Sequence, residues 1–449
     1  MYFECNLPRL APRHVKGEEV RKKLNEMLKN IHERMERLEQ ALDITGLPGD
    51  QFSAAAVRFF DKDAESGETL FDVLSAQQIA DMVAPVAKNM QYESRLDWPN
   101  AIVVVDTAYI TQSEWETARV IGLGGSDAAV TMGVSPYNTK LALYHNKVGT
   151  EFKKENVDPG LQYIFDYGHC VEDLVISEFC RKSGARRIPE SRMFAKKGMP
   201  FITANIDGII EMNGKIFVFE AKTTTQFNQD AWKDMKVPVQ YVPQCRQYMA
   251  VLDDPKVNGT YIGCIYGNTP DRFASAFIER NLDNEAEQLM VEKHFWETYI
   301  LSHVAPAAND NPKRNLELLR LLSGDVNKAA PSVLLTPTDR SAIDTYLELD
   351  GERKALAKRI DGIKEQQQAL IFSVCEELGD VTKGVLHKDD ENYYEVSYSP
   401  RSSTTVDKEM LQMAYPEAYR ECVHVNPESS RVISVKVKKY RKGEAPKVA

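Results

Sequence analysis

The chain has 449 residues and a net charge of −10, with 43% hydrophobic and 27% charged residues. This composition is ordinary for a globular protein of about two or three domains. The acidic charge argues against a protein that coats nucleic acid without specificity, and no apolar run reaches the roughly 18–20 residues of a membrane span.

The N-terminus lacks the basic start and the apolar block of a secretory signal. The seven cysteines form no C-x-x-C pair, so the sequence offers no obvious ligand set for a zinc ribbon or an iron–sulfur cluster. We therefore expect reduced thiols and a cytoplasmic protein.

The first predicted element is a long amphipathic helix over residues 18–44, in which apolar side chains recur at spacings of three and four. A glycine- and proline-containing stretch at 46–49 ends it. We assign residues 1–112 to a helical N-terminal extension.

Residues 113–305 mix short apolar strands with helices of medium length, which predicts an α/β domain. The expected helices cover 140–147, 172–182, 239–252 and 285–303, and the expected strands cover 201–210, 215–222, 260–266 and 273–279. A stretch rich in proline, asparagine and aspartate at 305–312 predicts a linker.

The C-terminal region, 306–449, begins with a second long helix at about 341–378, where Leu349, Leu356, Ile363 and Leu370 are seven residues apart. The two long helices either pair or mediate self-association, or each packs on a globular core. Strands are expected at 392–399 and 432–440, with a short helix at 408–414 between them. The last 19 residues carry seven basic side chains and one acid, either to contact phosphate or simply to remain solvated.

The sharpest chemical signal is a pair of acids in a predicted hairpin. Asn213-Gly214 is the dipeptide that a type I′ turn prefers, because both central residues need positive φ. A two-residue loop there pairs Met212 with Lys215 and, counted outward, Asp207 with Glu220. Directly opposed residues have Cβ atoms about 4.5–5.5 Å apart, so the two carboxylates repel unless a cation lies between them.

Lys222 follows Glu220 by two residues and therefore shares its face of the strand. We predict that Asp207 and Glu220 bind a divalent cation and that Lys222 orients a water or offsets charge in the transition state. This arrangement is typical of a metal-dependent phosphodiesterase. The alternative is an ion-pair cluster on the surface.

Two further motifs are weaker. Gly168 precedes Glu172, which is predicted to lie in the first turn of a helix. Glu172 is either a third carboxylate ligand or an acid that interacts favourably with the helix dipole. His169 is either a ligand or a residue that caps the helix or packs at its start. Gln244 and Tyr248 are four apart and share a helix face, where they could orient the water and contact a phosphate, or form only a polar edge.

A glycine-rich stretch, Gly122-Leu123-Gly124-Gly125-Ser126-Asp127, lies between Arg119 and a probable helix. Glycines allow close backbone approach to an anion, and the spacing differs from that of a nucleotide-binding loop. We expect either a site for one phosphate, with Arg119 and Ser126, or a turn capped by Asp127.

Taken in order, Arg119, Gly-Gly-Ser126-Asp127, Ser135-Pro136-Tyr137-Asn138-Thr139, Gly168-x-x-x-Glu172, Asp207-Gly208, Glu220-Ala221-Lys222 and Gln244-x-x-x-Tyr248 resemble the motifs of the YqaJ-type viral recombinase family. That family includes lambda-type alkaline exonucleases and belongs to the PD-(D/E)XK nuclease superfamily. The resemblance covers about residues 115–300. The chain departs from it at Ile206, where the superfamily has proline before the aspartate.

The resemblance implies a restriction-endonuclease-like α/β (α+β) core, with a mixed central sheet flanked by helices. It implies a Mg²⁺-dependent exonuclease (with Mn²⁺ as a substitute) that degrades double-stranded DNA from 5′ to 3′ and leaves 3′ single strands for an annealing recombinase. The metal ligands would be Glu172, Asp207, Glu220 and the Ala221 carbonyl. Lys222 and Gln244 would act on the water, Arg119 and Ser126 on the 5′-phosphate, and Tyr248 on DNA.

The resemblance also implies a phage or prophage protein in a bacterial cytosol and allows a homo-oligomer. Two alternatives remain open at this stage. One is a structure-specific or nicking endonuclease on the same core, and the other is a non-catalytic DNA-binding protein.

Overall fold

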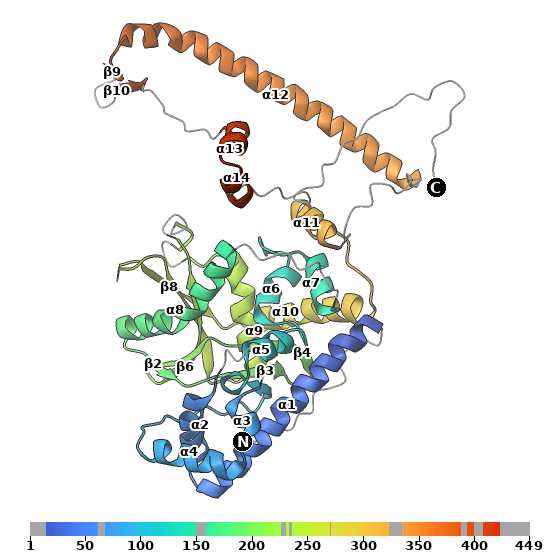
Figure 1. The fold of residues 1–449 in the computed structure, drawn as a ribbon, viewed down its shortest axis with the longest axis vertical. Coiled ribbons are helices and arrows are strands. Elements are labelled where there is room, and N and C mark those ends of the chain that lie inside the picture. The colour runs from blue at the N-terminus through green and yellow to red at the C-terminus, as the bar shows by residue number, and fades with distance from the viewer. Residues whose placement is uncertain are drawn as a thin grey trace. The chain divides into compact units, whose positions relative to one another are not determined.

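The computed structural model describes residues 15–61, 68–149, 159–225, 230–232, 236–269, 271–322, 335, 337–387, 393–398 and 407–422. The chain divides into two compact units, Met1–Gly324 and Asp325–Ala449. Figure 1 labels their helices and strands. Within the described part of the chain, no helix combines the length and apolar character that crossing a lipid bilayer requires.

The first unit opens with a helical layer. Its helices are α1 (Val15–Thr45), α2 (Gly49–Ala56), α3 (Leu70–Val73), α4 (Ala76–Lys88) and α5 (Gln112–Ala118), with short 3₁₀ turns at Val57–Phe59 and Thr107–Tyr109. The apolar stripe of α1, including Ile31, Met35 and Leu38, is buried in one cluster with α2, α4 and α5. The same cluster includes Ala118, Ile121, Met193 and Ala195, so the extension predicted over 1–112 shares its core with residues beyond it.

Two sheets follow. Strands β1 (Ala101–Asp106), β3 (Arg192–Lys196) and β4 (Met199–Asn205) form an antiparallel sheet in the order β1-β3-β4. Strands β2 (Arg186–Ile188), β5 (Gly208–Met212), β6 (Lys215–Thr223), β7 (Val257–Ile265) and β8 (Phe273–Glu279) form a sheet in the order β2-β5-β6-β7-β8. Only β6 and β7 run parallel, so this central sheet is mixed.

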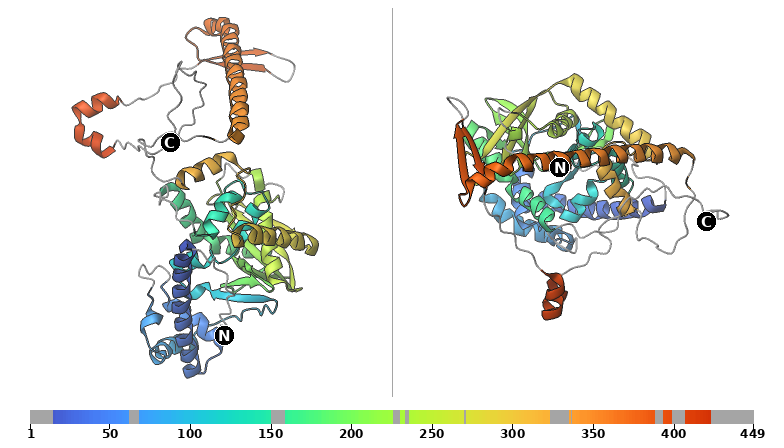
Figure 2. Two further views of the ribbon diagram at one scale, coloured as in Figure 1. Left: turned by 90° about the vertical axis from the view of Figure 1, so that its right-hand side faces the viewer. Right: turned by 90° about the horizontal axis from the view of Figure 1, so that it is seen from above.

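Helices cover both faces of the central sheet, and Figure 2 draws the ribbon in two further views. The helix α8 (Pro159–Ser183) packs Ile176 and Phe179 against Phe219 and its neighbours. The helix α9 (Val242–Leu252) packs on the alternate residues, such as Val218. Helices α6 (Gly125–Thr131), α7 (Lys140–Lys147), α10 (Leu282–Phe295), with its π-helical extension Trp296–Leu301, and α11 (Pro312–Leu322) complete the unit. The structure confirms the predicted α/β core with a mixed central sheet flanked by helices.

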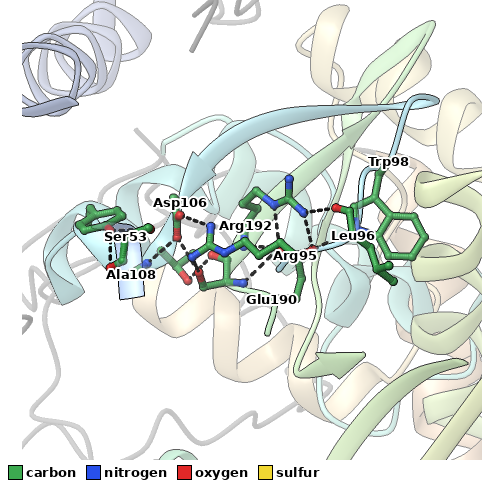
Figure 3. Close-up of polar contacts among 11 residues, drawn as sticks. Ser53, Arg95, Leu96, Trp98, Asp106, Ala108, Glu190 and Arg192 are labelled. Carbon is green, nitrogen blue, oxygen red and sulfur yellow. Dashed lines mark hydrogen bonds and ion pairs between the residues drawn. The ribbon is translucent and has the colours of Figure 1, made fainter. Parts of the chain in front are cut away.

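A polar network fixes the turn after β1, and Figure 3 shows its members. Arg95 and Ser191 both hydrogen-bond to the Asp106 carboxylate, which also accepts from the Ala108 amide at 3.0 Å. Arg192 binds Glu190 and the Leu96 carbonyl. The segment before β1 is thus joined to the start of β3, and the turn at 107–110 is held in place.

The second unit contains α12 (Pro337–Leu378), the antiparallel pair β9 (Lys383–His387) and β10 (Tyr393–Ser397), and the short helices α13 (Lys408–Ala414) and α14 (Pro416–Cys422). The predicted long helix and the helix at 408–414 are confirmed, and β9 and α14 were not predicted. The strand predicted at 432–440 and the basic tail lie outside the described residues.

Two local predictions are wrong. The single strand expected over 201–210 is two strands, β4 and β5, which belong to different sheets and are separated at Ile206 and Asp207. The helix expected to begin near Glu172 begins at Pro159. A glycine inside a helix costs only about 1 kcal/mol, so Gly168 does not end it.

Candidate functional site

The β5–β6 hairpin has the register that the turn residues predict. Asn213 and Gly214 have φ of 54° and 74°, Met212 pairs with Lys215, and Gly208 pairs with Phe219. One position further out, the Ala221 amide donates to Asp207 Oδ2 at 2.9 Å. Asp207 is therefore held against the segment that carries Glu220.

Glu220 is buried, with an exposed side-chain fraction of 0%. Its Oε1 pairs with Lys222 Nζ, but its Oε2 has no hydrogen-bond partner. Burial and the nearby Asp207 carboxylate raise the pKa of Glu220 to about 8. Burial alone would lower the pKa of Lys222, but Glu220 and Asp207 outweigh it and raise that pKa above its usual value. Among the described residues, Lys222 is the basic side chain that pairs with Glu220.

Glu172 approaches the same acids from α8. It lies in the middle of the helix, so the prediction of an acid in the first turn is wrong, and a role in favouring the helix dipole is wrong with it. Burial and the charge of Asp207 raise the pKa of Glu172 to about 7. His169, one turn earlier, is exposed, and its ring meets the ring of Trp115 edge-on at 6.0 Å between centroids.

A cavity of about 500 Å³ joins these groups. Every residue that the sequence analysis placed in the site lines it: Arg119, Ser126, Glu172, Asp207, Glu220, Ala221, Lys222, Gln244 and Tyr248. The cavity therefore gathers residues from α5, α6, α8, β6 and α9, together with Asp207 just before β5.

At one end of the cavity Arg119 and Ser126 meet. Arg119 Nη2 donates to Ser126 Oγ at 2.9 Å, and its guanidinium lies over the Trp115 ring at 4.6 Å from the centroid. Both Arg119 and Ser126 are exposed. The sequence analysis missed Trp115, although its position four residues before Arg119 on a helix could have indicated the contact.

A buried lysine, Lys147, connects the segment that carries Arg119 to the helix that carries Ser126. Lys147 Nζ lies 2.8 Å from Asp127 Oδ2 and donates to the Arg119 carbonyl at 2.9 Å. The prediction that Asp127 is the N-cap residue is wrong in detail: Gly124 is the N-cap, and Asp127 accepts a hydrogen bond from the Gly124 amide. No local pattern in the sequence pointed to Lys147.

The helix α9 supplies Gln244, whose Nε2 donates to the Tyr248 hydroxyl at 2.7 Å. Tyr248 is buried against α6, and a Cβ at Gly125 would lie only 2.6 Å from its ring. Gln247, which the sequence analysis missed, donates to the carbonyls of Leu123 and Thr203, both at 2.7 Å. Because of these contacts, α9 holds the glycine-rich stretch beside the acid pair.

The N-terminal layer contacts the helix that carries Trp115. Arg34 of α1 is fully buried and donates to Asp72, to the Tyr109 carbonyl and to Glu114 of α5. Glu114 also accepts from the Thr111 amide at the start of α5. The extension therefore fixes the orientation of α5.

The donor set fits a divalent cation. In the residues that the structure describes, no three His, Cys, Asp or Glu side chains converge on one point. Mg²⁺, however, is usually held by one or two carboxylates and completed by water and substrate phosphate. Asp207 and Glu220 supply two carboxylates. Glu220 Oε2 is a buried oxygen without a hydrogen-bond partner, which is the kind of atom that coordinates a cation.

Comparison with known sequences gives two matches. Residues 114–255 match the family model of the YqaJ-like viral recombinase domain. The chain is 26% identical over 323 residues to the uncharacterized protein YqaJ of Bacillus subtilis (strain 168), which covers 72% of this chain and 93% of that protein.

Two similar solved structures are those of LHK-Exo, an alkaline exonuclease from Laribacter hongkongensis, alone and in complex with dAMP. Both are 17% identical to this chain, with TM-scores of 0.36 and 0.35. Each alignment covers 46% of this chain and 100% of the LHK-Exo chain.

Proposed function

We propose that the chain is a Mg²⁺-dependent deoxyribonuclease, because residues 114–255 match the family model of the YqaJ-like viral recombinase domain. Its substrate is the end of double-stranded DNA, and it degrades the 5′-terminated strand. The observation that carries this proposal is the opposition of Asp207 to the buried Glu220, whose free Oε2 and Lys222-paired Oε1 suit a cation and a reacting phosphate.

In this proposal Asp207, Glu220 and the Ala221 carbonyl hold the metal ion, and Glu172 completes the set from α8. When bound, Mg²⁺ or Mn²⁺ would supply Lewis-acid chemistry, polarising a phosphoryl oxygen and lowering the pKa of a water. Burial, and after it the charge of Asp207, raises the pKa values of Glu172 and Glu220. Bound metal would favour their ionised forms.

Lys222 and Gln244 act on the water and the phosphate. The Lys222 ammonium beside Glu220 orients the attacking water and offsets negative charge on the phosphate as the transition state forms. Gln244 is held by the buried Tyr248 and presents its amide to the cavity. Tyr248, which the sequence predicts to contact DNA, also fixes Gln244 by accepting this hydrogen bond.

Arg119 and Ser126 bind the 5′-terminal phosphate. A guanidinium offers a planar fork of donors that matches phosphate oxygens, and stacking on Trp115 orients that fork. Each cut leaves a new 5′-phosphate that the same side chains can bind, which gives the reaction its 5′-to-3′ direction. The 3′ single strands that result suit an annealing recombinase as the partner protein.

The direct test uses linear duplexes labelled at either end of one strand, incubated with Mg²⁺, and a closed circular duplex as control. We expect early release of the 5′ label as mononucleotide, late release of the 3′ label, and an intact circle. Cutting of the circle would indicate an endonuclease instead. Binding without cleavage in Mg²⁺ and in Mn²⁺ would indicate a non-catalytic DNA-binding protein.

A further inference from the structure

The long helix α12 carries an apolar stripe that no described residue of its own unit covers. Its 42 residues correspond to about 63 Å at 1.5 Å per residue. The side chains at seven-residue spacing are exposed: Leu349 by 60%, Leu356 by 59%, Ile363 by 46% and Leu370 by 79%. A strict seven-residue apolar repeat is the pattern of a helix that winds around another helix.

A second set of positions completes the heptads. With Leu349, Leu356, Ile363 and Leu370 at d, the a positions are Tyr346, Arg353, Ile360, Gln367 and Val374. Tyr346 and Ile360 are exposed as well. Such a seam over about four heptads is long enough to indicate a coiled coil.

The other long helix of the chain is not free to fill this seam. The stripe of α1 is buried within the first unit, where Ile31 and Met35 each have an exposed fraction of 2%. A partner helix of matching length and matching repeat is, however, available in every other copy of α12. We propose that α12 forms an antiparallel two-stranded coiled coil with α12 of a second copy of this chain.

Charge selects the antiparallel orientation. In a parallel pair the two Arg353 side chains would lie in the same a layer and repel each other. Arg359 at position g would also face Lys364 at position e of the second copy, and this repulsion would occur on both sides of the coiled coil. In an antiparallel pair centred between Leu356 and Ile360, Arg353 instead lies against Ile363 of the second copy.

The same antiparallel register brings Asp350 opposite Lys364 of the second copy, twice by symmetry. In the single chain Asp350 pairs with Arg353 and Lys354, and Lys364 pairs with Asp361, all within the same helix. One repulsive contact remains, between the two Arg359 side chains beside the symmetry axis. The balance of two attractive pairs against one repulsive pair favours this orientation.

The test is the molar mass of the full-length chain, measured by light scattering during size-exclusion chromatography. We expect twice the chain mass for the parent and the single-chain mass for the double variant Leu356→Glu/Ile363→Glu. Both side chains are exposed in the single chain, so the variant should keep its helix content and melting profile. The matched control is Phe372→Glu, which replaces an exposed apolar residue of α12 outside the stripe and should remain dimeric.

Orientation is tested separately. Asp350→Lys and Lys364→Asp should each weaken the dimer, and the double exchange D350K/K364D should restore it. Arg359→Cys should form an intermolecular disulfide that the parent chain does not, because only the antiparallel pair brings the two 359 positions together. A monomeric parent, or a dimer that survives L356E/I363E, would overturn the proposal. Failure of both orientation tests in a dimer would overturn the antiparallel arrangement. None of these measurements depends on nuclease activity.

Discussion

Arg34 and Glu114, which lie 80 residues apart in the sequence, are joined by two buried hydrogen bonds of 3.0 and 3.2 Å. Arg34 also binds Asp72 through two hydrogen bonds of 2.8 Å. One buried guanidinium thus holds α1, α3 and α5 together, and α5 is the helix that carries Trp115.

Removal of this guanidinium should destabilise the protein. Arg34→Ala leaves two partly buried carboxylates without their cation, which typically costs about 3–5 kcal/mol. The free energy of unfolding from urea titration measures the effect. Arg37→Ala is the control, because Arg37 is half-exposed and reaches Asp72 only at 4.0 Å. Equal losses in the two variants would show that the buried contacts have no special weight.

The acid pair should be essential for cleavage. We expect Glu220→Ala and Asp207→Asn each to abolish DNA hydrolysis while DNA binding survives, because each removes a carboxylate from the proposed metal site. Mn²⁺ or Mg²⁺ should raise the melting temperature of the parent but not of the variants. Glu211→Gln, in the same hairpin but paired with Arg186 outside the cavity, is the control. Full activity in either acid variant would remove that residue from the site.

Lys222 should act mainly on turnover. Lys222→Ala is expected to lower kcat by about 10² or more with little change in KM, as for a group that stabilises the transition state. Steady-state kinetics on a linear duplex measures both constants. Lys215→Ala, at the exposed start of the same strand, should leave them unchanged. A shift in melting temperature with normal turnover would make Lys222 a structural residue.

Arg119 should determine the preference for a phosphorylated end. The parent is expected to degrade 5′-phosphorylated duplexes faster than 5′-hydroxyl duplexes, and Arg119→Ala should lose rate chiefly on the phosphorylated ends. Arg119→Lys keeps the charge but not the fork, so it should recover only part of the preference. Initial rates on the two end chemistries give the answer. A variant that retains the whole preference would exclude Arg119 from phosphate recognition.

Glu292 on α10 should make stability depend on pH. Burial raises its pKa to about 8, only partly opposed by the hydrogen bond from Gln288, and its Oε2 has no partner. The folded state therefore favours the neutral acid. This contribution is complete below the ordinary pKa of 4.5 and is lost as the pH rises through about 8.

We accordingly expect Glu292→Gln, which cannot ionise, to be more stable than the parent at pH 8 and to approach it near pH 5. The slope for the parent is at most about 1.4 kcal/mol per pH unit. Melting temperatures across this pH range measure the difference. Glu287→Gln, exposed on the same helix, should follow the parent. Parallel curves for Glu292→Gln and the parent would contradict the assignment.

The acid pair could be predicted because the information is local. Two residues, Asn213 and Gly214, set the turn, and period-2 alternation then places Asp207, Glu220 and Lys222 without any knowledge of the remaining fold. The existence of α7, α9, β7, β8 and α12 followed equally from short-range pattern.

What could not be predicted depends on distant partners. Apolar side chains recur throughout residues 199–212, and pairing with β3 on one side and β6 on the other divides the segment between two sheets. Lys147 and Gln247 donate hydrogen bonds to main-chain carbonyls that are distant in the sequence. Because every residue has a carbonyl, the sequence contains no pattern that identifies these acceptors. The contact of Arg34 with α5 likewise requires the folded N-terminal layer.

The two-residue loop at Asn213-Gly214 also limits how this chain can vary. It lies at the far end of the hairpin from Asp207, yet it determines which face Glu220 and Lys222 occupy. One inserted residue that shifted the pairing by a single step would turn both side chains to the α8 face of the sheet. Insertions in most surface loops are neutral, whereas here the loop length decides which side chains of β6 line the cavity. Over evolutionary time this turn should therefore accept substitutions between small polar residues, but not changes in length.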